Sequence, residues 1–344
     1  MSAFLLPQKT GLAILPRMIL AGDIGGTKVN LAFFTESLRL TADNLESFPS
    51  RDYASLEDIV FKFLSERSLK AQYACFGIAG PVKHGRVAVT NLPWIIIDKE
   101  LKAALKLKAV WLINDLEANA HGIYGLTPKD FITLNKGEEV AVGDAAIISA
   151  GTGLGEAGLF WDGNRHLPSA SEGGHADFAP RTDLDIELLQ YLRTRFDQPD
   201  WETVLSGPGL YHIYEFLRQR NGTEPAWLAT ELRSEEPPKV ITRAALENKN
   251  DLCVQALDLF VDYYGAEAAN LALKILSTGG IYIGGGIAPK IIAKLTDGRF
   301  MKAFIGAGRM KALLAAMPVR VIMNDKTALI GAARYAAMQS GKMI

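Results

Sequence analysis

One local pattern occurs twice in this sequence of 344 residues: an apolar run, a glycine-rich turn with a threonine, and a second apolar run. The first copy spans residues 18–34 around Gly25-Gly26, and the second spans residues 144–161 around residues 151–155. Each copy has the pattern of a β-hairpin. Glycine permits positive φ and leaves backbone N–H groups open to close approach by an anion, and phosphate is the anion that we expect. The repetition predicts two related domains that face one nucleotide between them.

Further polar and glycine residues extend the predicted nucleotide site. Asp23 ends the first apolar run and is placed to orient water around a Mg²⁺ ion that bridges phosphates. A third glycine run follows the apolar residues 280–283, and its open backbone permits a flat group such as adenine to lie against it. An ordinary hairpin and an ordinary strand-to-helix turn are the structural alternatives for these patterns. The predicted nucleotide-binding residues are Gly22, Asp23, Ile24, Gly25, Gly26, Thr27, Gly151, Thr152, Gly153, Gly284, Gly285 and Gly286.

Length and composition limit the class of protein. The chain exceeds the roughly 250–300 residues at which single hydrophobic cores stop growing, so we expect two domains. The 37 basic and 38 acidic residues nearly balance, and no basic run indicates a nucleic-acid or membrane partner. Small molecules are therefore the expected partners. The two cysteines, Cys75 and Cys253, are typical of a reducing compartment such as the cytoplasm, and no apolar run predicts a membrane span.

Polar residues that suit a ligand site follow apolar stretches of the chain. Asn114 and Asp115 come directly after the strand-like residues 110–113, and ligands of α/β sheets bind outside the carboxyl ends of strands. Glu172 and His175 share a glycine-rich loop, which favours a ligand-binding loop over a purely structural histidine. These residues predict a site for a polar ligand.

Residues 153–158 also satisfy the G-x-G-x-x-G pattern of dinucleotide-binding folds. That motif requires a helix directly after the turn and an acidic residue about 20 positions later. Here the β-like residues 159–161 follow, so we expect a second strand and disfavour a dinucleotide site. No Walker A sequence occurs in the chain.

The motifs carry a family resemblance. Residues 23–27, 151–153 and 284–286 resemble the first phosphate, second phosphate and adenosine motifs of the sugar kinase, heat-shock ATPase and actin superfamily. Within it, four stretches in the same order resemble the bacterial glucokinases outside the ROK group, and the likeness extends from about Met18 to the last predicted helix. The four stretches are residues 112–115, 171–175, 177–180 and 204–209.

The resemblance implies an α/β, two-domain, actin-like ATPase fold of the ribonuclease H-like type, with an interdomain cleft. The small domain would comprise residues 1–116, completed by a C-terminal helix within 325–344, and the large domain residues 117–324. The implied reaction is ATP-dependent phosphorylation of glucose at its 6-hydroxyl, the first step of glycolysis, with Mg²⁺. A homodimer is also implied, while the cytoplasm is the expected location because no peroxisomal tripeptide ends the sequence.

The resemblance also assigns roles by position. Asp115 matches the catalytic base, and Asn91 falls in a loop that lies near the sugar in similar enzymes. The residues that match glucose-binding positions are Asn91, Asn114, Asp115, Glu172, His175 and Glu202. The departures from the family pattern are the first 17 residues and the segment 221–239, which is polar, contains prolines and is expected to be a surface excursion.

Three alternatives remain. Another hexose kinase would act on fructose, mannose or an amino sugar, but the ROK group typically has a cysteine cluster for zinc, and no cysteine lies between Cys75 and Cys253. A sugar-sensing repressor on the same fold needs a helix-turn-helix domain, whereas 17 residues precede the first hairpin. An actin-like or chaperone-like ATPase has no use for the polar residues at 172, 175 and 202.

Overall fold

The computed structural model describes residues 18–35, 38, 40–89, 91–138, 140–306 and 308–341. These residues form two compact units, one within Met1–Ile113 and Ala332–Ile344 and one within Asn114–Gly331. The chain crosses between the units twice, after strand β7 and inside the last helix. Among the described residues, none of the helices combines the length and apolar character needed to cross a membrane.

A five-stranded sheet in the order β3-β2-β1-β4-β7 forms the centre of the first unit. Its strands are β1 (Met18–Ile24), β2 (Lys28–Thr35), β3 (Leu40–Pro49), β4 (Ala71–Ile78) and β7 (Ala109–Asn114). Strand β1 pairs antiparallel with β2, Ile24 opposite Val29, and parallel with β4. The first predicted hairpin is therefore confirmed.

The other elements of the first unit cover this sheet. Helix α1 turns Leu56, Ile59, Val60 and Phe63 inward at helical spacing, and the Ser55 side chain caps its start by accepting from the Asp58 N–H. The remaining elements are η1 (Ser50–Asp52), α1 (Leu56–Ser65), β5 (Arg86–Ala88), β6 (Ile95–Ile97), α2 (Asp98–Leu105) and the end of α12 (Thr327–Gln339).

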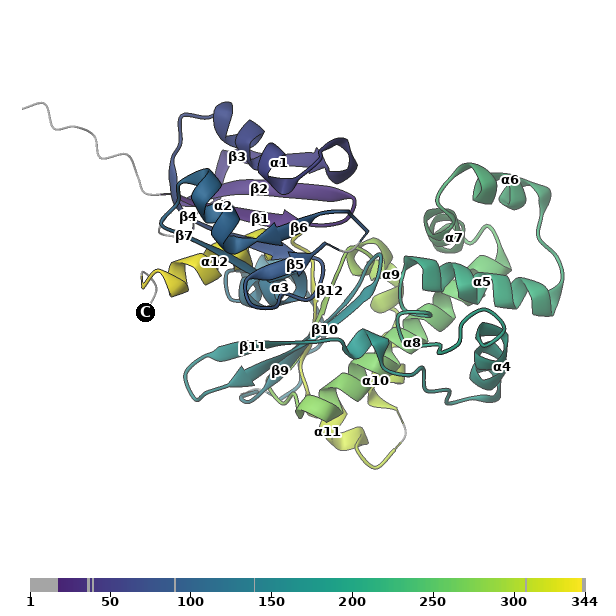
Figure 1. Cartoon of the computed structure of the whole chain (residues 1–344). Coiled ribbons are helices and arrows are strands. Elements are labelled where there is room, and N and C mark those ends of the chain that lie inside the picture. Colours follow the sequence, from purple (N-terminus) through teal and green to yellow (C-terminus); the bar gives the residue numbers. More distant parts are fainter. Residues whose placement is uncertain are drawn as a thin grey trace, which may run out of the picture. The chain divides into compact units, whose positions relative to one another are not determined.

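The second unit repeats the strand order of the first. Its six-stranded sheet runs β11-β10-β9-β12-β13-β8, and its first five strands match β3-β2-β1-β4-β7 one for one. Strands β9 to β12 and the long helix α8 of this unit are labelled in Figure 1. As β1 does, β9 pairs antiparallel with the next strand and parallel with β12. Strand β10 directly follows the 151–153 turn, so no dinucleotide-binding helix begins there, as predicted. The strands are β8 (Phe131–Asn135), β9 (Ala145–Ala150), β10 (Leu154–Trp161), β11 (His166–Ser171), β12 (Gly280–Gly284) and β13 (Val319–Ile322).

Helices cover both faces of the second sheet. Ala146 and Ile148 of β9 belong to one core with the long helix α8, whereas Ala145 and Ile147 belong to another core with Leu116 of α3. This alternation follows from the two-residue period of a strand. The helices are α3 (Asp115–Ile123), η2 (Pro128–Asp130), η3 (Gly173–His175), α4 (Asp183–Leu192), α5 (Gly207–Asn221), α6 (Ala226–Ser234), α7 (Pro237–Leu246), α8 (Asp251–Ile275), η4 (Ala288–Ile291), α9 (Ile292–Leu295), α10 (Arg299–Ile305) and α11 (Lys311–Ala316).

The segment 221–239 is more ordered than its polar composition indicates. It contains α6 and the start of α7, and its Leu228 and the adjoining Val240 are buried in the core of the second unit. Proline occupies the first turn of α7, where its missing N–H costs no hydrogen bond.

We expect Gly331→Ala to destabilise the protein. A Cβ at Gly331 would lie 1.7 Å from the carbonyl oxygen of Ala118 in α3, and a backbone atom cannot move away as a side chain can. Overpacking of this kind costs roughly 1–3 kcal/mol. Thermal unfolding should show a lower Tm than wild type, whereas Gly308→Ala, with nothing of the described chain within 4 Å of the added atom, is the matched control. Equal Tm values for the two variants would contradict the close contact between α3 and α12.

Candidate active site

Asn114 and Asp115 lie where β7 ends and α3 begins. The Asn114 side chain caps the helix, since its Oδ1 accepts from the backbone N–H groups of Leu116 at 2.8 Å and Glu117 at 3.3 Å. Asp115 is the first helical residue, and its Oδ1 accepts from the same Leu116 N–H at 2.9 Å. The positive end of the helix dipole stabilises negative charge at this position. The predicted base is therefore held in one orientation at a helix start.

The loop after β11 carries Glu172 and His175. It turns tightly, because the His175 N–H donates to the carbonyl of Glu172 at 3.0 Å. Its glycines permit close packing on β10, since a Cβ at Gly174 would lie 2.1 Å from the carbonyl oxygen of Leu154. A larger residue at Gly174 would push the loop away from β10, and Glu172 and His175 would move with it.

Glu202 lies against the same loop. The Glu202 N–H donates to the carbonyl of Gly174 at 2.9 Å, and its carboxylate oxygen Oε2 accepts from the Leu154 N–H at 2.9 Å. A Cβ at Gly153 would lie only 2.4 Å from that oxygen. The structure thus brings Glu172, His175 and Glu202 together on β10, next to the predicted second phosphate turn.

His175 forms an ion pair that the sequence does not indicate. Its Nδ1 lies 2.8 Å from Oδ2 of Asp200, and the imidazole side chain is 55% exposed. The hydrogen bond to Asp200 raises the pKa of His175 above its usual range, and the charges of Glu202 and Glu172 add to this effect against the opposing effect of burial. A raised pKa increases the fraction of His175 that is positively charged near neutral pH.

The second glycine turn and the third glycine run lie together in the second unit. A Cβ at Gly285, where φ is +82°, would lie 2.2 Å from the carbonyl oxygen of Ala150. The buried hydroxyl of Tyr264 joins the two segments, since it accepts from the Ala150 N–H and donates to the Gly284 carbonyl, both at 3.1 Å. A Cβ added at Gly286 would meet no atom of the described chain within 4 Å, so this position is open. The second glycine turn and the exposed Gly285 and Gly286 therefore lie next to each other, whereas Gly284 is buried beneath them.

One predicted phosphate donor of this turn is already engaged. The Gly151 N–H donates to the carbonyl of Gly153 at 2.8 Å, and the Gly151 carbonyl accepts from the Gly207 N–H at 2.8 Å. The exposed Thr152, with its hydroxyl and N–H, is thus the turn's main candidate for contact with a phosphate.

The first glycine turn belongs to the first unit and differs from the expected form. Gly25 and Gly26 are absent from the positive-φ residues of the described chain, so left-handed backbone is not why glycine is needed there. The Gly25 N–H donates to the Lys28 carbonyl at 3.0 Å, and the Ser50 hydroxyl donates to the Gly25 carbonyl at 2.8 Å. Glycine instead keeps the turn unshielded, and Thr27 is exposed at its end.

Asp23 and the other predicted residues of the first unit have distinct surroundings. Burial raises the pKa of Asp23, although Asn30 donates to its Oδ2 at 3.1 Å. Gly22 and Ile24 are buried, and Gly22 packs so closely that a Cβ would lie 2.4 Å from the Phe76 ring. Asn91 lies in the loop between β5 and β6, with left-handed φ of 63°. Among the described residues, no group of three or more His, Cys, Asp and Glu side chains suits a metal ion.

A pair of buried acids lies beneath the Glu172 loop. Glu156 of β10 is 1% exposed and Glu267 of α8 is fully buried, and each has an Oε1 atom without a hydrogen-bond partner in the described chain. Burial, followed by the charge of Glu267, raises the pKa of Glu156 to about 8. Glu156 Oε2 would lie 2.1 Å from a Cβ at Gly173, so the pair directly supports the loop. Lys274 Nζ lies 3.6 Å from Glu267 Oε1 and partly offsets the pKa shift of Glu156, and a proton shared by the two acids would relieve the rest of their repulsion.

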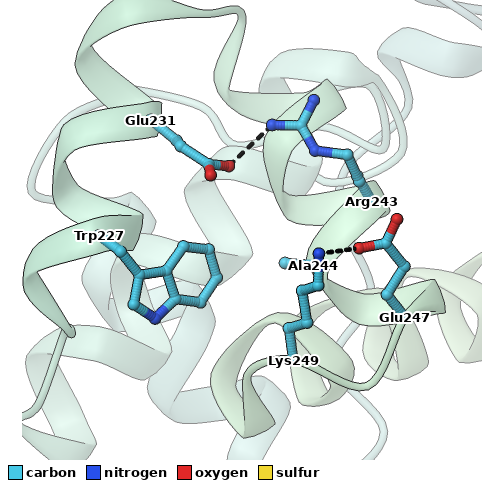
Figure 2. A pocket seen from close by; sticks show the side chains of 6 residues that line it. All are labelled: Trp227, Glu231, Arg243, Ala244, Glu247 and Lys249. Carbon is cyan, nitrogen blue, oxygen red and sulfur yellow. Dashed lines mark hydrogen bonds and ion pairs between the residues drawn. The ribbon is translucent and has the colours of Figure 1, made fainter.

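A separate cavity of about 350 Å³ lies between α6, α7 and the residues that connect α7 to α8. Figure 2 shows the Trp227 ring opposite two ion pairs, Arg243 with Glu231 and Lys249 with Glu247. None of the predicted sugar or nucleotide residues lines this cavity. Because its charged side chains pair with one another and none of the predicted site residues lines it, we do not assign the active site to this cavity.

Comparison with known proteins identifies the family. The glucokinase family model matches residues 20–339. A glucokinase from Nostoc sp. is 43% identical over 338 residues, which cover 93% of this chain and 99% of that protein. The chain belongs to the glucokinase family. The family predicted from the motifs is therefore confirmed.

Solved glucokinase structures share the fold. A glucokinase from an Antarctic psychrotroph superposes with a TM-score of 0.79 at 32% identity, covering 93% of this chain and 98% of that chain. A glucokinase from Balamuthia mandrillaris, solved in complex with glucose, has a TM-score of 0.78 at 20% identity, covering 93% and 94%. These neighbours confirm the predicted α/β sugar kinase fold class for this glucokinase-family chain.

Two residues of the site were missed by sequence analysis. Asp200 contacts His175, and Glu156 supports the Glu172 loop, yet neither falls in a family motif. Each had a weak signal: Asp200 lies two positions before Glu202, and Glu156 is the one acid in the otherwise apolar stretch of residues 154–161.

We expect Glu156→Gln to change how the stability of this glucokinase-family protein depends on pH. Because the folded-state pKa of Glu156 is raised from 4.5 to about 8, the folded protein holds a proton that the unfolded chain releases in this range. Wild-type stability should therefore fall as pH rises from about 4.5 to about 8, by roughly 2–4 kcal/mol. In Glu156→Gln, where an amide can donate to Glu267, this fall should be absent in chemical denaturation at a series of pH values.

The exposed Glu236→Gln substitution is the control for that experiment and should keep the wild-type slope. A wild-type stability that does not change over this pH range would contradict a shared proton between Glu156 and Glu267.

Proposed function

We propose that the chain transfers the γ-phosphoryl group of ATP to the 6-hydroxyl of glucose, giving glucose 6-phosphate and ADP, with Asp115 as the catalytic base. Membership in the glucokinase family supports the reaction. The observation that carries the site is the convergence of Glu172, His175 and Glu202 on β10, beside the 151–153 turn, within one compact unit.

A neutral sugar offers no charge to bind, so its site must use many directed hydrogen bonds. Glu172 and Glu202 can each accept from hydroxyl groups, and charge-assisted hydrogen bonds are about twice as strong as neutral ones. His175 and Asn114 add donors. A sugar with one inverted hydroxyl would leave a carboxylate partly unpaired, at a cost of roughly 1–3 kcal/mol. This chemistry supports a preference for one hexose.

Asp115 would accept the proton of the 6-hydroxyl as its oxygen attacks phosphorus. The transition state of phosphoryl transfer is loose, so orientation of the nucleophile matters more than strong basicity. The fixed place of Asp115 at the start of α3, with Oδ1 held by the Leu116 N–H, supports such an orienting role.

The glycine turns are the proposed phosphate-binding elements of the two units, with Thr27 in one and Thr152 in the other. Mg²⁺ neutralises phosphate charge when bound, and it is commonly held by one or two carboxylates through water. The desolvated carboxylate of Asp23 fits this role, because a nearby cation would offset the cost of its burial. The homodimer implied by the resemblance and the cytoplasmic location expected from the sequence stay predictions.

We expect Asp115→Ala to abolish most glucose-dependent ADP formation. Loss of a general base lowers kcat by roughly 10²–10⁴-fold. The measurement is ADP release from Mg·ATP with glucose, mannose, fructose and N-acetylglucosamine as acceptors. Wild type should be most active with glucose. If the enzyme is active only with another sugar, the proposed mechanism stands and the proposed substrate is wrong. If no sugar stimulates ADP release, the proposal is refuted.

Asp251→Ala is the matched control for Asp115→Ala. Asp251 is also the first residue of a helix and also follows a capping asparagine, Asn250, whose side chain accepts from the Cys253 N–H. Both substitutions remove a carboxylate from the first turn of a helix, and only the one at Asp115 should lower kcat.

We expect Asp23→Asn to raise the Mg²⁺ concentration needed for half-maximal rate by roughly 10–100-fold, as is usual for outer-sphere groups. Because burial disfavours the Asp23 carboxylate, the same variant should retain or gain thermal stability. Rates measured against Mg²⁺ concentration, with Asp52→Asn as an exposed control, test this role. An unchanged Mg²⁺ requirement would exclude Asp23 from the metal site.

A further inference from the structure

The segment that contains Asp200 is fixed against the loop that contains His175. Three backbone hydrogen bonds join them: Phe178 N–H to the Pro199 carbonyl at 3.1 Å, Trp201 N–H to the Ala176 carbonyl at 2.9 Å, and Glu202 N–H to the Gly174 carbonyl at 2.9 Å. Asp177 and Asp200 face each other as an antiparallel bridge. The contact between His175 and Asp200 is thus set by backbone register and not by two flexible side chains.

The two oxygens of Asp200 have different partners. Oδ1 accepts from the Thr203 N–H at 2.8 Å and from the Thr203 hydroxyl at 2.6 Å, which leaves Oδ2 for His175 Nδ1 at 2.8 Å. Burial alone would raise the pKa of Asp200, but the hydrogen bonds from Thr203 and His175 outweigh it and hold the pKa below its usual value. An ionised carboxylate only accepts, so Nδ1 must carry a proton.

We infer that Asp200 is a positioning residue that keeps a proton on Nδ1 of His175, so that Nε2 contacts the sugar and donates to it when the ring is positively charged. This inference rests on the proposed function. The candidate sugar residues Asp115, Glu172 and Glu202 are acceptors when ionised, so a hydroxyl oxygen that accepts needs a donor such as Nε2–H. Asp200 therefore determines which kind of hydrogen bond the imidazole offers.

This arrangement makes glucose binding depend on pH in the wild type. The charged groups that face His175 are Asp200, Glu202 and Glu172, and all three favour its protonated form. As pH rises through the raised pKa, the ring loses a proton. Asp200 retains the proton on Nδ1, so Nε2 becomes an acceptor and its hydrogen bond to the sugar is lost. KM for glucose should therefore rise roughly tenfold between about pH 6 and about pH 9, because the loss of one charge-assisted hydrogen bond weakens binding by about that factor.

Asp200→Asn should reverse the roles of the two ring nitrogens. The two donors of Thr203 require an acceptor, so the amide oxygen stays with Thr203 and the amide NH₂ faces Nδ1. Nδ1 must then accept, and the neutral ring carries its proton on Nε2. Nε2 would thus donate to the sugar at all pH values in this range, so KM should not change with pH.

Two measurements test the inference. The ¹⁵N shifts of His175, assigned by comparison with His175→Gln, should show an Nδ1–H ring with a pKa above 6.5 in wild type and an Nε2–H ring with a lower pKa in Asp200→Asn. KM for glucose against pH should rise in wild type and remain level in the variant, and Asp197→Asn, an exposed acid in the same segment, should match wild type in both.

Any result that differs from these expectations overturns a specific part of the inference. An unchanged tautomer and pKa in Asp200→Asn would refute the positioning role. A changed tautomer with an unchanged pH profile of KM would refute donation by Nε2 to the sugar. If wild type fails to phosphorylate glucose, the proposed function fails, while the spectra still decide whether Asp200 sets the tautomer of His175.

Discussion

The candidate site of the second unit depends on the backbone pairing of residues 174–178 with residues 199–202. Each of these segments is irregular by itself, and the three hydrogen bonds between them supply the order that a strand or a helix would otherwise give. They hold His175 opposite Asp200 and Glu202 against the Leu154 N–H. Backbone hydrogen bonds therefore fix the positions of these polar side chains. Ion pairs exposed to water would contribute little to this, because their interaction energies are small.

Glycines make this close pairing possible. At Gly153, Gly173 and Gly174, an added Cβ would lie within about 2.5 Å of a carboxylate or carbonyl oxygen. The conformational freedom of glycine is secondary at these positions, since none of the three is among the residues of the described chain with positive φ. Gly25 and Gly26 also lack positive φ, although a Cβ at Gly25 would lie 3.3 Å from its nearest neighbour, the Lys28 carbonyl oxygen. In these motifs, glycine is needed mainly because backbone and polar groups pack where a Cβ would lie. A glycine-rich pattern therefore predicts that a turn is present, but not the backbone conformation of that turn.

The sequence predicted the features that are local in the chain. Apolar runs on either side of a glycine turn predicted both hairpins. The apolar run before Asn114-Asp115 likewise predicted that these residues lie at the end of a strand. The roles of Glu172, His175 and Glu202 came from the family resemblance and stay predictions. Asp200 and Glu156 were missed because their importance arises from contacts with residues 25 and 111 positions away in the chain. Helix α6 and the start of α7 were missed because the polar composition of residues 221–239 hid buried residues such as Leu228.

Trp201 connects the core of the second unit to the chemistry of its site. Asp200 and Glu202 are partly exposed, whereas Trp201 between them is 2% exposed and packs edge-on against Phe178 at 5.1 Å. Trp201 also begins a turn, since its carbonyl accepts from the N–H groups of Val204 and Leu205, and its own N–H donates to the Ala176 carbonyl, so its burial fixes the segment that carries both acids against the His175 loop. The large apolar area of the tryptophan thus stabilises the positions of two carboxylates that would otherwise repel each other. A change in the packing around Phe178 would consequently move the partner of His175 and the candidate sugar ligand Glu202 together.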